Sequence, residues 1–241
     1  MNEDSPNSIS VTKEKAVDLD FRLEEEFHLG AKKFGNNPLH QKFQNGGDIR
    51  ELLQFVPRML FFVMGFKDLM QLVRYKNPKN KLEESVNIHS DEDSYHWKWF
   101  LDDLTFISGK FNNFTSSDLI AEVWKDETLE VRQTIYLFSR YVQRFQDPVA
   151  RMLMIEVLEI TFDEFKEALH PVLKEAGLYN QLDYFGLKHQ ETEENHSTGT
   201  SDDEIAGLIE NLDSSLKEEM LTVVPILFDQ MYRMAKNWAE A

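Results

Sequence analysis

The chain has 241 residues, which is enough for one large domain or two small ones with a sizeable core. Its formal net charge is −17, so the field around the protein repels phosphate groups and disfavours nucleic acid and anionic lipid as partners. The sequence contains no cysteine, which excludes disulfides, thiolate catalysis and cysteine-ligated metal sites, so any metal must bind to His, Asp and Glu.

The N-terminal residues 1–18 are polar and acidic, with no helical periodicity and no apolar segment of the kind found in signal peptides. We expect them to form a disordered tail. The longest apolar stretch, residues 59–66, is too short to span a bilayer. We therefore expect a cytoplasmic protein that has no membrane partner.

After the tail, apolar residues recur at helical spacing, and no Asn-Gly hairpin signal lies between alternating β-branched runs. This pattern predicts a single all-α domain over residues 19–241. Asp48 is the expected N-cap of the third helix, and Pro57 should kink that helix or restart it. Helices are predicted over residues 19–34, 39–44, 49–75, 81–108, 118–124, 127–146, 149–175, 180–197, 203–211 and 213–239.

Two of these predicted helices each carry a stripe of histidine and glutamate on one face. The residues are His89, Glu92 and His96 in the first stripe and His189, Glu193 and His196 in the second. Helical spacing points such side chains toward a common centre, which is how dimetal sites are built in helix bundles, and iron and manganese accept this nitrogen and oxygen ligand set. The alternative for each stripe is a solvated acidic face with incidental histidines.

A third helix usually supplies a further carboxylate to such a site. The predicted helix over residues 149–175 offers Glu159 and Glu156 within an apolar run, where an unpaired carboxylate is costly. Glu159 is the first choice and Glu156 the second. The alternative is that either one points to solvent.

Aromatic residues lie next to both stripes. Trp99 follows His96 closely, and Tyr184 and Phe185 precede the second stripe. Such residues most often belong to the core, and here they are also candidates to exclude water from a metal and to line a substrate pocket.

Three stretches resemble the haem-oxygenase-like superfamily, which shares its fold with the thiaminase-II-like proteins. They are residues 37–53, residues 92–104 and residues 184–199, and the last of these is similar to the His-x3-acid-x2-His signature of the iron-containing redox enzymes called haem-oxygenase-like di-iron oxidases. The resemblance spans residues 23–240, although only the last motif is specific.

This resemblance implies a bundle of about seven core helices around a non-haem di-iron centre. Such an oxidoreductase holds two irons per chain, or manganese, and uses O2 to oxidise a small-molecule substrate. The ligands implied by position are Glu92, His96, Glu159, His189, Glu193 and His196. The spacing of acid and histidine on the first of these helices varies in the family, so His89 can substitute for or supplement Glu92, and Glu156 remains the alternative to Glu159.

Members of the superfamily often dimerise, so the resemblance also suggests a homodimer. The competing expectation is a metal-free member of the same fold that binds a small molecule or a partner protein. In that protein the two histidine and glutamate stripes would form a polar pocket.

Overall fold

The computed structural model describes residues 6–112, 114–193 and 202–241. Twelve α-helices and no β-strand occur in these residues, so the all-α prediction is confirmed. The α-helices are α1 (Pro6–Gly35), α2 (Pro38–Asn45), α3 (Ile49–Leu52), α4 (Val56–Val73), α5 (Lys81–Asp93), α6 (His96–Ile107), α7 (Ser116–Trp124), α8 (Leu129–Arg144), α9 (Pro148–Glu175), α10 (Leu187–Glu193), α11 (Asp202–Glu210) and α12 (Ser214–Ala239). None of these helices is both long enough and apolar enough to cross a membrane.

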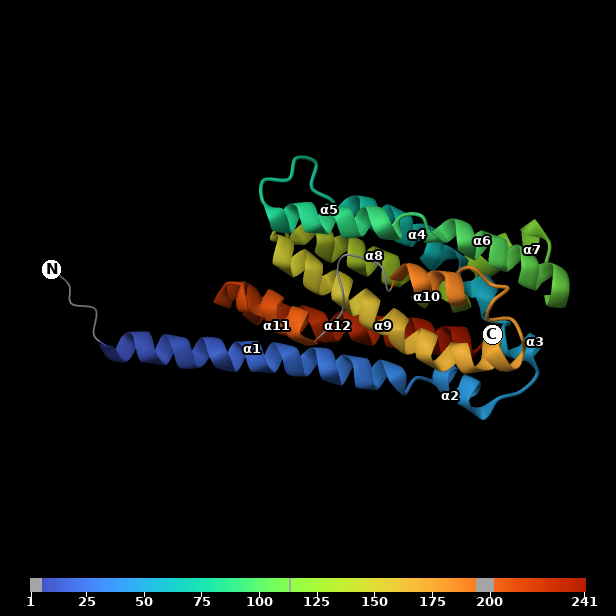
Figure 1. The fold of residues 1–241 in the computed structure, drawn as a ribbon, viewed down its shortest axis with the longest axis horizontal. Coiled ribbons are helices and arrows are strands. Elements are labelled where there is room, and N and C mark those ends of the chain that lie inside the picture. The colour runs from blue at the N-terminus through green and yellow to red at the C-terminus, as the bar shows by residue number, and fades with distance from the viewer. Residues whose placement is uncertain (1–5, 113, 194–201) are drawn as a thin grey trace.

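The long helices α9 and α12 lie inside the bundle. Helix α1 runs along one edge and packs on α12 and α9, while α4 and α5 lie toward the opposite edge (Figure 1). Helix α8 joins the two sides because it packs on both α4 and α12. Helix α5 packs on α9, and this contact brings His89 of the first predicted stripe to Glu159, the predicted carboxylate of the third helix.

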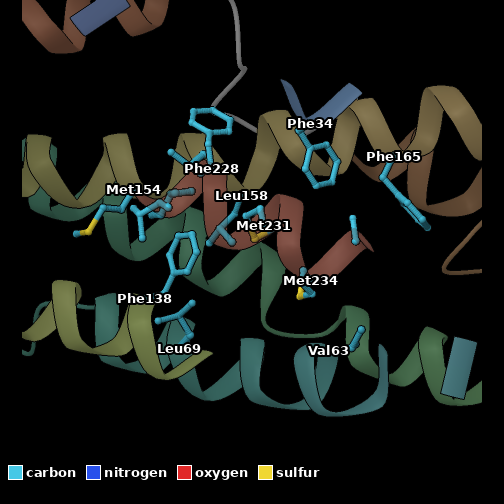
Figure 2. Close-up of a cluster of buried hydrophobic side chains, with 14 of the residues drawn as sticks. Phe34, Val63, Leu69, Phe138, Met154, Leu158, Phe165, Phe228, Met231 and Met234 are labelled. Carbon is cyan, nitrogen blue, oxygen red and sulfur yellow. The ribbon is translucent and has the colours of Figure 1, made fainter. Parts of the chain in front are cut away.

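The core between these helices is formed by large apolar side chains. Figure 2 shows Phe138 of α8, Leu158 of α9 and Met231 of α12 gathered in it, and all three are buried. Gly30 of α1 faces the ring of Phe228 on α12 so closely that a Cβ atom at this position would collide with the ring. A glycine here therefore allows helices α1 and α12 to approach each other closely.

The first helix is longer than the sequence predicted. Helix α1 begins at Pro6, so residues 6–18, which were expected in the disordered tail, form its first turns, and residues 1–5 lie outside the described part. Proline suits the first position of a helix because its ring fixes φ near the helical value. The segment lacks a regular apolar stripe, and that stripe is the signal by which a helix is recognised in a sequence.

Three other predicted helices are divided or shortened, and one of them is the helix predicted from residue 180, since α10 begins only at Leu187. Pro57 restarts the chain as α4 after the short helix α3, and the side chain of Asp48 caps α3 by accepting the N–H of Arg50 at 2.8 Å, both as expected. The predicted helix over residues 81–108 is broken by a turn at residues 94–95. The hydroxyl of Ser94 donates to the carbonyl of Asp91 at 2.9 Å, a local bond that competes with continued helix.

Arg151, in the first turn of α9, donates hydrogen bonds to backbone carbonyls at the C-terminal ends of two other helices. Its guanidinium donates to the carbonyl oxygens of Phe145 at 2.9 Å, Val73 at 2.5 Å and Val142 at 3.3 Å. The side chain is buried, so these carbonyls have a charged donor where water is absent. Arg151 thus ties the C-terminal ends of α4 and α8 to the start of α9.

Replacing this guanidinium should destabilise the fold. We expect Arg151→Met to lower the free energy of unfolding by about 3 kcal/mol, because three buried carbonyls lose their donor. Urea denaturation measures the change. Arg144→Met is the matched control, since Arg144 lies near the same helix end but its ion pair with Glu219 is exposed, and it should change stability by less than about 1 kcal/mol. Equal effects of the two changes would contradict this role for Arg151.

His40 of α2 is buried against the end of α1. Its Nδ1–H donates to the carbonyl of Gly35 at 3.2 Å, and its ring meets the edge of Phe34. Burial lowers the pKa of His40 to about 4, and the hydrogen bond to Gly35 opposes this only in part. The folded protein therefore keeps His40 neutral, whereas the unfolded chain protonates it near the ordinary pKa of about 6.5.

This difference makes stability depend on pH with a definite sign. The contribution of His40 is complete above about pH 6.5 and is lost as the pH falls toward 4, because only the unfolded chain takes up the proton in that range. We expect the wild-type protein to lose about 2 kcal/mol more unfolding free energy between pH 7 and about pH 4.5 than His40→Gln. Denaturant titrations at a series of pH values test this, and the exposed His28→Gln should behave as wild type.

Candidate metal centre

Six side chains with metal-binding atoms form two groups inside the bundle. The carboxylate-rich group is His89, Asp93 and Glu159, and the histidine-rich group is His96, His189 and Glu193. In each group one ligand atom from every residue lies within 4.8 Å of the others. Four helices contribute, so the tertiary fold assembles both groups from distant parts of the chain.

The carboxylate-rich group joins α5 to α9. His89 and Asp93 stand one turn apart on α5, and His89 Nε2 lies 3.0 Å from Asp93 Oδ2. The same nitrogen lies 3.3 Å from Glu159 Oε1, which α9 supplies through its packing on α5. His89 and Asp93 are fully buried, and the Glu159 side chain is 13% exposed.

The histidine-rich group joins the start of α6 to α10. His189 Nε2 lies 3.0 Å from Glu193 Oε1, one turn later on α10, and 3.0 Å from His96 Nδ1. His96 Nδ1 lies 3.5 Å from Glu193 Oε1. His96 is the first residue after the turn at residues 94–95, so this turn sets where its ring lies relative to α5.

The spacing within both groups suits a first-row transition metal. Bonds of about 2.0–2.2 Å to nitrogen or oxygen, at tetrahedral or octahedral angles, place neighbouring ligand atoms about 3.0–3.5 Å apart. The interatomic distances above lie in this range. Hydrogen bonds from an imidazole N–H to a carboxylate oxygen or to another imidazole nitrogen have similar lengths, so the same positions also suit the metal-free protein.

Charge in the carboxylate-rich group favours a cation at its centre. Burial by itself lowers the pKa of His89, but hydrogen bonds and the negative charges of Asp93 and Glu159 outweigh it and raise this pKa to about 11. Burial, with the charge of Asp93, raises the pKa of Glu159 to about 7. Glu193 of the histidine-rich group contributes to that rise, so the two groups act on each other electrostatically. In the metal-free protein an imidazolium therefore supplies the positive charge that buried carboxylates require.

A backbone carbonyl fixes the orientation of His189. The Nδ1 atom lies 2.8 Å from the carbonyl oxygen of Tyr184, and because a carbonyl can only accept, Nδ1 carries the hydrogen. In the neutral ring Nε2 then presents its lone pair to Glu193 and His96. Metal-binding histidines commonly have this arrangement, in which the second nitrogen donates to a carbonyl or carboxylate.

The loop that carries this carbonyl is held by a buried carboxylate on α6. Asp103 accepts the backbone N–H groups of Asp183 at 2.7 Å, Tyr184 at 2.9 Å and Phe185 at 3.0 Å. Burial raises the pKa of Asp103 to about 6, although these three donors oppose the rise. Asp103 is not among the residues that the sequence indicated, but its position three residues after Phe100 and next to Leu104 places it on the apolar face of α6.

Both groups open into one pocket. Five of the six metal-binding side chains line it, namely Asp93, His96, Glu159, His189 and Glu193. Most of the remaining lining is apolar, with rings from α1, α4, α9 and α12. A metal bound in either group would thus face a chamber suited to an apolar organic molecule.

The structure brings together five of the eight residues that the sequence indicated as ligands or alternatives: His89, His96, Glu159, His189 and Glu193. Glu92 is half-buried and belongs to neither group, because His89 shares its helix face with Asp93 instead. Glu156 is buried on α9 but also belongs to neither group within the described residues. His196 lies outside the described residues.

The three predicted pocket residues have different positions. Tyr184 lines the pocket. Trp99 stacks on the ring of His96, with centroids 4.9 Å apart, and Phe185 packs against Phe55 and Phe165; neither is among the residues that line the pocket. Trp99 therefore covers a candidate ligand, whereas Phe185 belongs to the core beneath it.

Comparison with protein-family models gives no match for this chain, and comparison with curated proteins gives none either. The resemblance to the haem-oxygenase-like superfamily therefore remains a prediction. The chemistry available at this site follows from its own six side chains and the pocket beside them.

The role of Asp103 is testable without metal. We expect Asp103→Asn to lower the free energy of unfolding by about 2 kcal/mol and to speed amide hydrogen exchange at residues 183–185, because the side-chain NH2 group cannot accept a hydrogen bond. Asp102→Asn is the matched control, since Asp102 is the exposed neighbour on the same helix. Unchanged exchange at the loop amides in Asp103→Asn would show that the carboxylate does not hold the loop.

Proposed function

We propose that this protein is a non-haem metal-dependent oxidase that uses O2 to oxidise a small organic substrate. It would hold two divalent metal ions, with iron as the first choice and manganese as the second. The observation that carries the proposal is the pair of buried nitrogen and oxygen groups that open into one apolar pocket. Either group alone would be an ordinary buried ion pair. Two adjacent groups beside a single apolar pocket are the arrangement expected of a dimetal active site in a helix bundle.

The residues present fit divalent iron or manganese. Each group offers three ligand atoms, which leaves further coordination positions for O2, water or substrate. Imidazole and carboxylate ligands suit these metals, and sulfur ligands are absent from the chain apart from methionine. The three carboxylates would balance three of the four positive charges of two divalent ions, so binding would offset both the burial and the carboxylate repulsion that raise the pKa of Glu159.

When bound, the metal pair supplies the redox chemistry toward O2, and the protein supplies orientation and a dry environment. Trp99 stacks on His96, and the ring of Phe162 lies 4.7 Å from that of His189, so both imidazoles are covered by aromatic side chains. Asp103 and the carbonyl of Tyr184 hold His189 with Nε2 directed into the site. The apolar pocket excludes water from the side on which a substrate would enter.

A metal-free binding protein is the second candidate, and one observation favours it. The side chains of each group already contact one another at hydrogen-bonding distance, as His89 does with Asp93 at 3.0 Å and His189 with His96 at 3.0 Å. Buried polar groups that satisfy one another need no ion. If the protein is such a metal-free binding protein, alanine substitutions in the two groups would change its affinity for the ligand and leave its metal content at zero.

Metal content decides between the two candidates. Protein purified without chelator and reconstituted anaerobically with ferrous iron should hold about two irons per chain, and exposure to O2 should oxidise them with a transient change in visible absorption. His89→Ala and His189→Ala should each lose about one iron, because each removes a ligand from a different group. Elemental analysis of desalted protein measures the content.

The exposed His28→Ala is the control, since it removes a histidine without touching either group. It should retain the wild-type iron content. Circular dichroism checks that each variant remains helical. Folded wild-type protein that retains no iron would exclude the oxidase and leave the binding protein.

A further inference from the structure

Trp238, in the last turn of α12, has a buried polar atom that its surroundings do not satisfy. The residue is 3% exposed and lines the pocket beside the two metal-binding groups. Its indole N–H finds no acceptor among the residues that the structure describes. A buried donor without a partner costs free energy, so its presence in the wall of a pocket calls for an explanation, and a bound ligand is one.

The walls around Trp238 are aromatic and hydrocarbon in character. Its ring lies 6.4 Å from Phe55, 6.0 Å from Phe62 and 6.2 Å from Phe165, measured between centroids. These neighbours have no hydrogen-bond acceptor to offer. The cation that lines the pocket, Lys67, is exposed and lies over the ring of Trp97, so its charge is directed to a different part of the pocket wall.

A row of rings connects Trp238 with the histidine-rich group. The ring of Phe162 lies 4.7 Å from His189, Phe165 lies 6.3 Å from Phe162, and Trp238 lies 6.2 Å from Phe165. Two phenylalanines therefore lie between the indole and the imidazole of His189 along this row. A molecule lying along this wall would have one end near the metal-binding groups and the other near Trp238.

We propose that Trp238 is a specificity-determining residue whose indole N–H donates a hydrogen bond to a neutral oxygen acceptor of the substrate. The substrate class is an apolar molecule with a carbonyl or ether oxygen at the end away from the metal-binding groups. A neutral acceptor fits because the rings that pack against the indole, those of Phe55, Phe62 and Phe165, carry no charge that could stabilise an anion. This inference rests on the proposed oxidase only in treating the ligand as a substrate, because the binding itself needs no metal.

The experiment uses metal-free, full-length protein with 15N-labelled tryptophan. Its four indole N–H signals are followed by NMR during titration with 4-phenyl-2-butanone and, separately, with n-butylbenzene, which has the same shape but lacks the carbonyl oxygen. Trp238→Phe assigns the Trp238 signal by its disappearance. Trp124 is the internal control, because it is 60% exposed and does not line the pocket.

We expect the ketone to move the Trp238 indole proton downfield, and the hydrocarbon to leave it without that shift. Trp124 should not move with either probe. Trp238→Phe should weaken ketone binding about three- to tenfold and change hydrocarbon binding by less than about twofold, because only one hydrogen bond is removed.

A ketone that binds without shifting the Trp238 signal, or that fails to bind, would overturn the proposal. If Trp238→Phe does not fold, Trp97→Phe, Trp99→Phe and Trp124→Phe assign the other three indole signals and leave that of Trp238 by elimination, so the test does not depend on that one variant. Iron content is measured separately. A shift in protein that cannot hold iron would support Trp238 as a recognition residue in a binding protein, and iron without a shift would overturn this inference alone.

Discussion

The burial of three carboxylates beside three imidazoles is the constraint on which this structure depends. Ionised carboxylates in an apolar interior are stable only when a cation or several donors lie next to them. Here the nearest positive charge in the metal-free protein is the imidazolium of His89, held between Asp93 and Glu159. The distances between these atoms are also those expected around a divalent ion, so the proposed metal-bound state would need no change of spacing.

The helices around the site are arranged so that these side chains can be buried together. Helix α9 passes through the bundle and delivers Glu159 to α5, and its first turn carries Arg151, which caps the ends of α4 and α8. Asp103 of α6 holds the loop before α10, and that loop holds His189. The ligands thus rest on packed helices and buried hydrogen bonds, which is the support that a precise metal site requires.

The pocket places the two candidate metal-binding groups beside an apolar space. The candidate metal ligands form one part of its wall, aromatic rings form most of the rest, and Trp238, whose N–H is buried, belongs to the same wall. Such a chamber favours apolar molecules with few, well-placed polar atoms. The proposed chemistry and the proposed recognition of an oxygen acceptor therefore concern the same space, although each stands on separate side chains.

The sequence by itself determined the fold class, most helix positions and the residue types of the site. The N-cap at Asp48, the restart at Pro57 and the helical spacing of apolar residues are local properties, so they are visible without a structure. The two histidine stripes identified His96, His189 and Glu193, which lie together in the fold. The apolar run around Glu159 indicated a buried carboxylate, because such a residue needs a partner.

Only the tertiary structure decided the rest. The turn at residues 94–95 contains neither glycine nor proline, and a serine by itself does not end a helix, so the sequence did not show that α5 would end there or that Asp93, rather than Glu92, would lie beside His89. Asp103 and Trp238 have their roles because of segments far away in the chain, namely the loop at residues 183–185 and the rings of α4 and α9. Helical periodicity specifies which face of a helix is buried, but which groups meet across that face depends on how the helices pack.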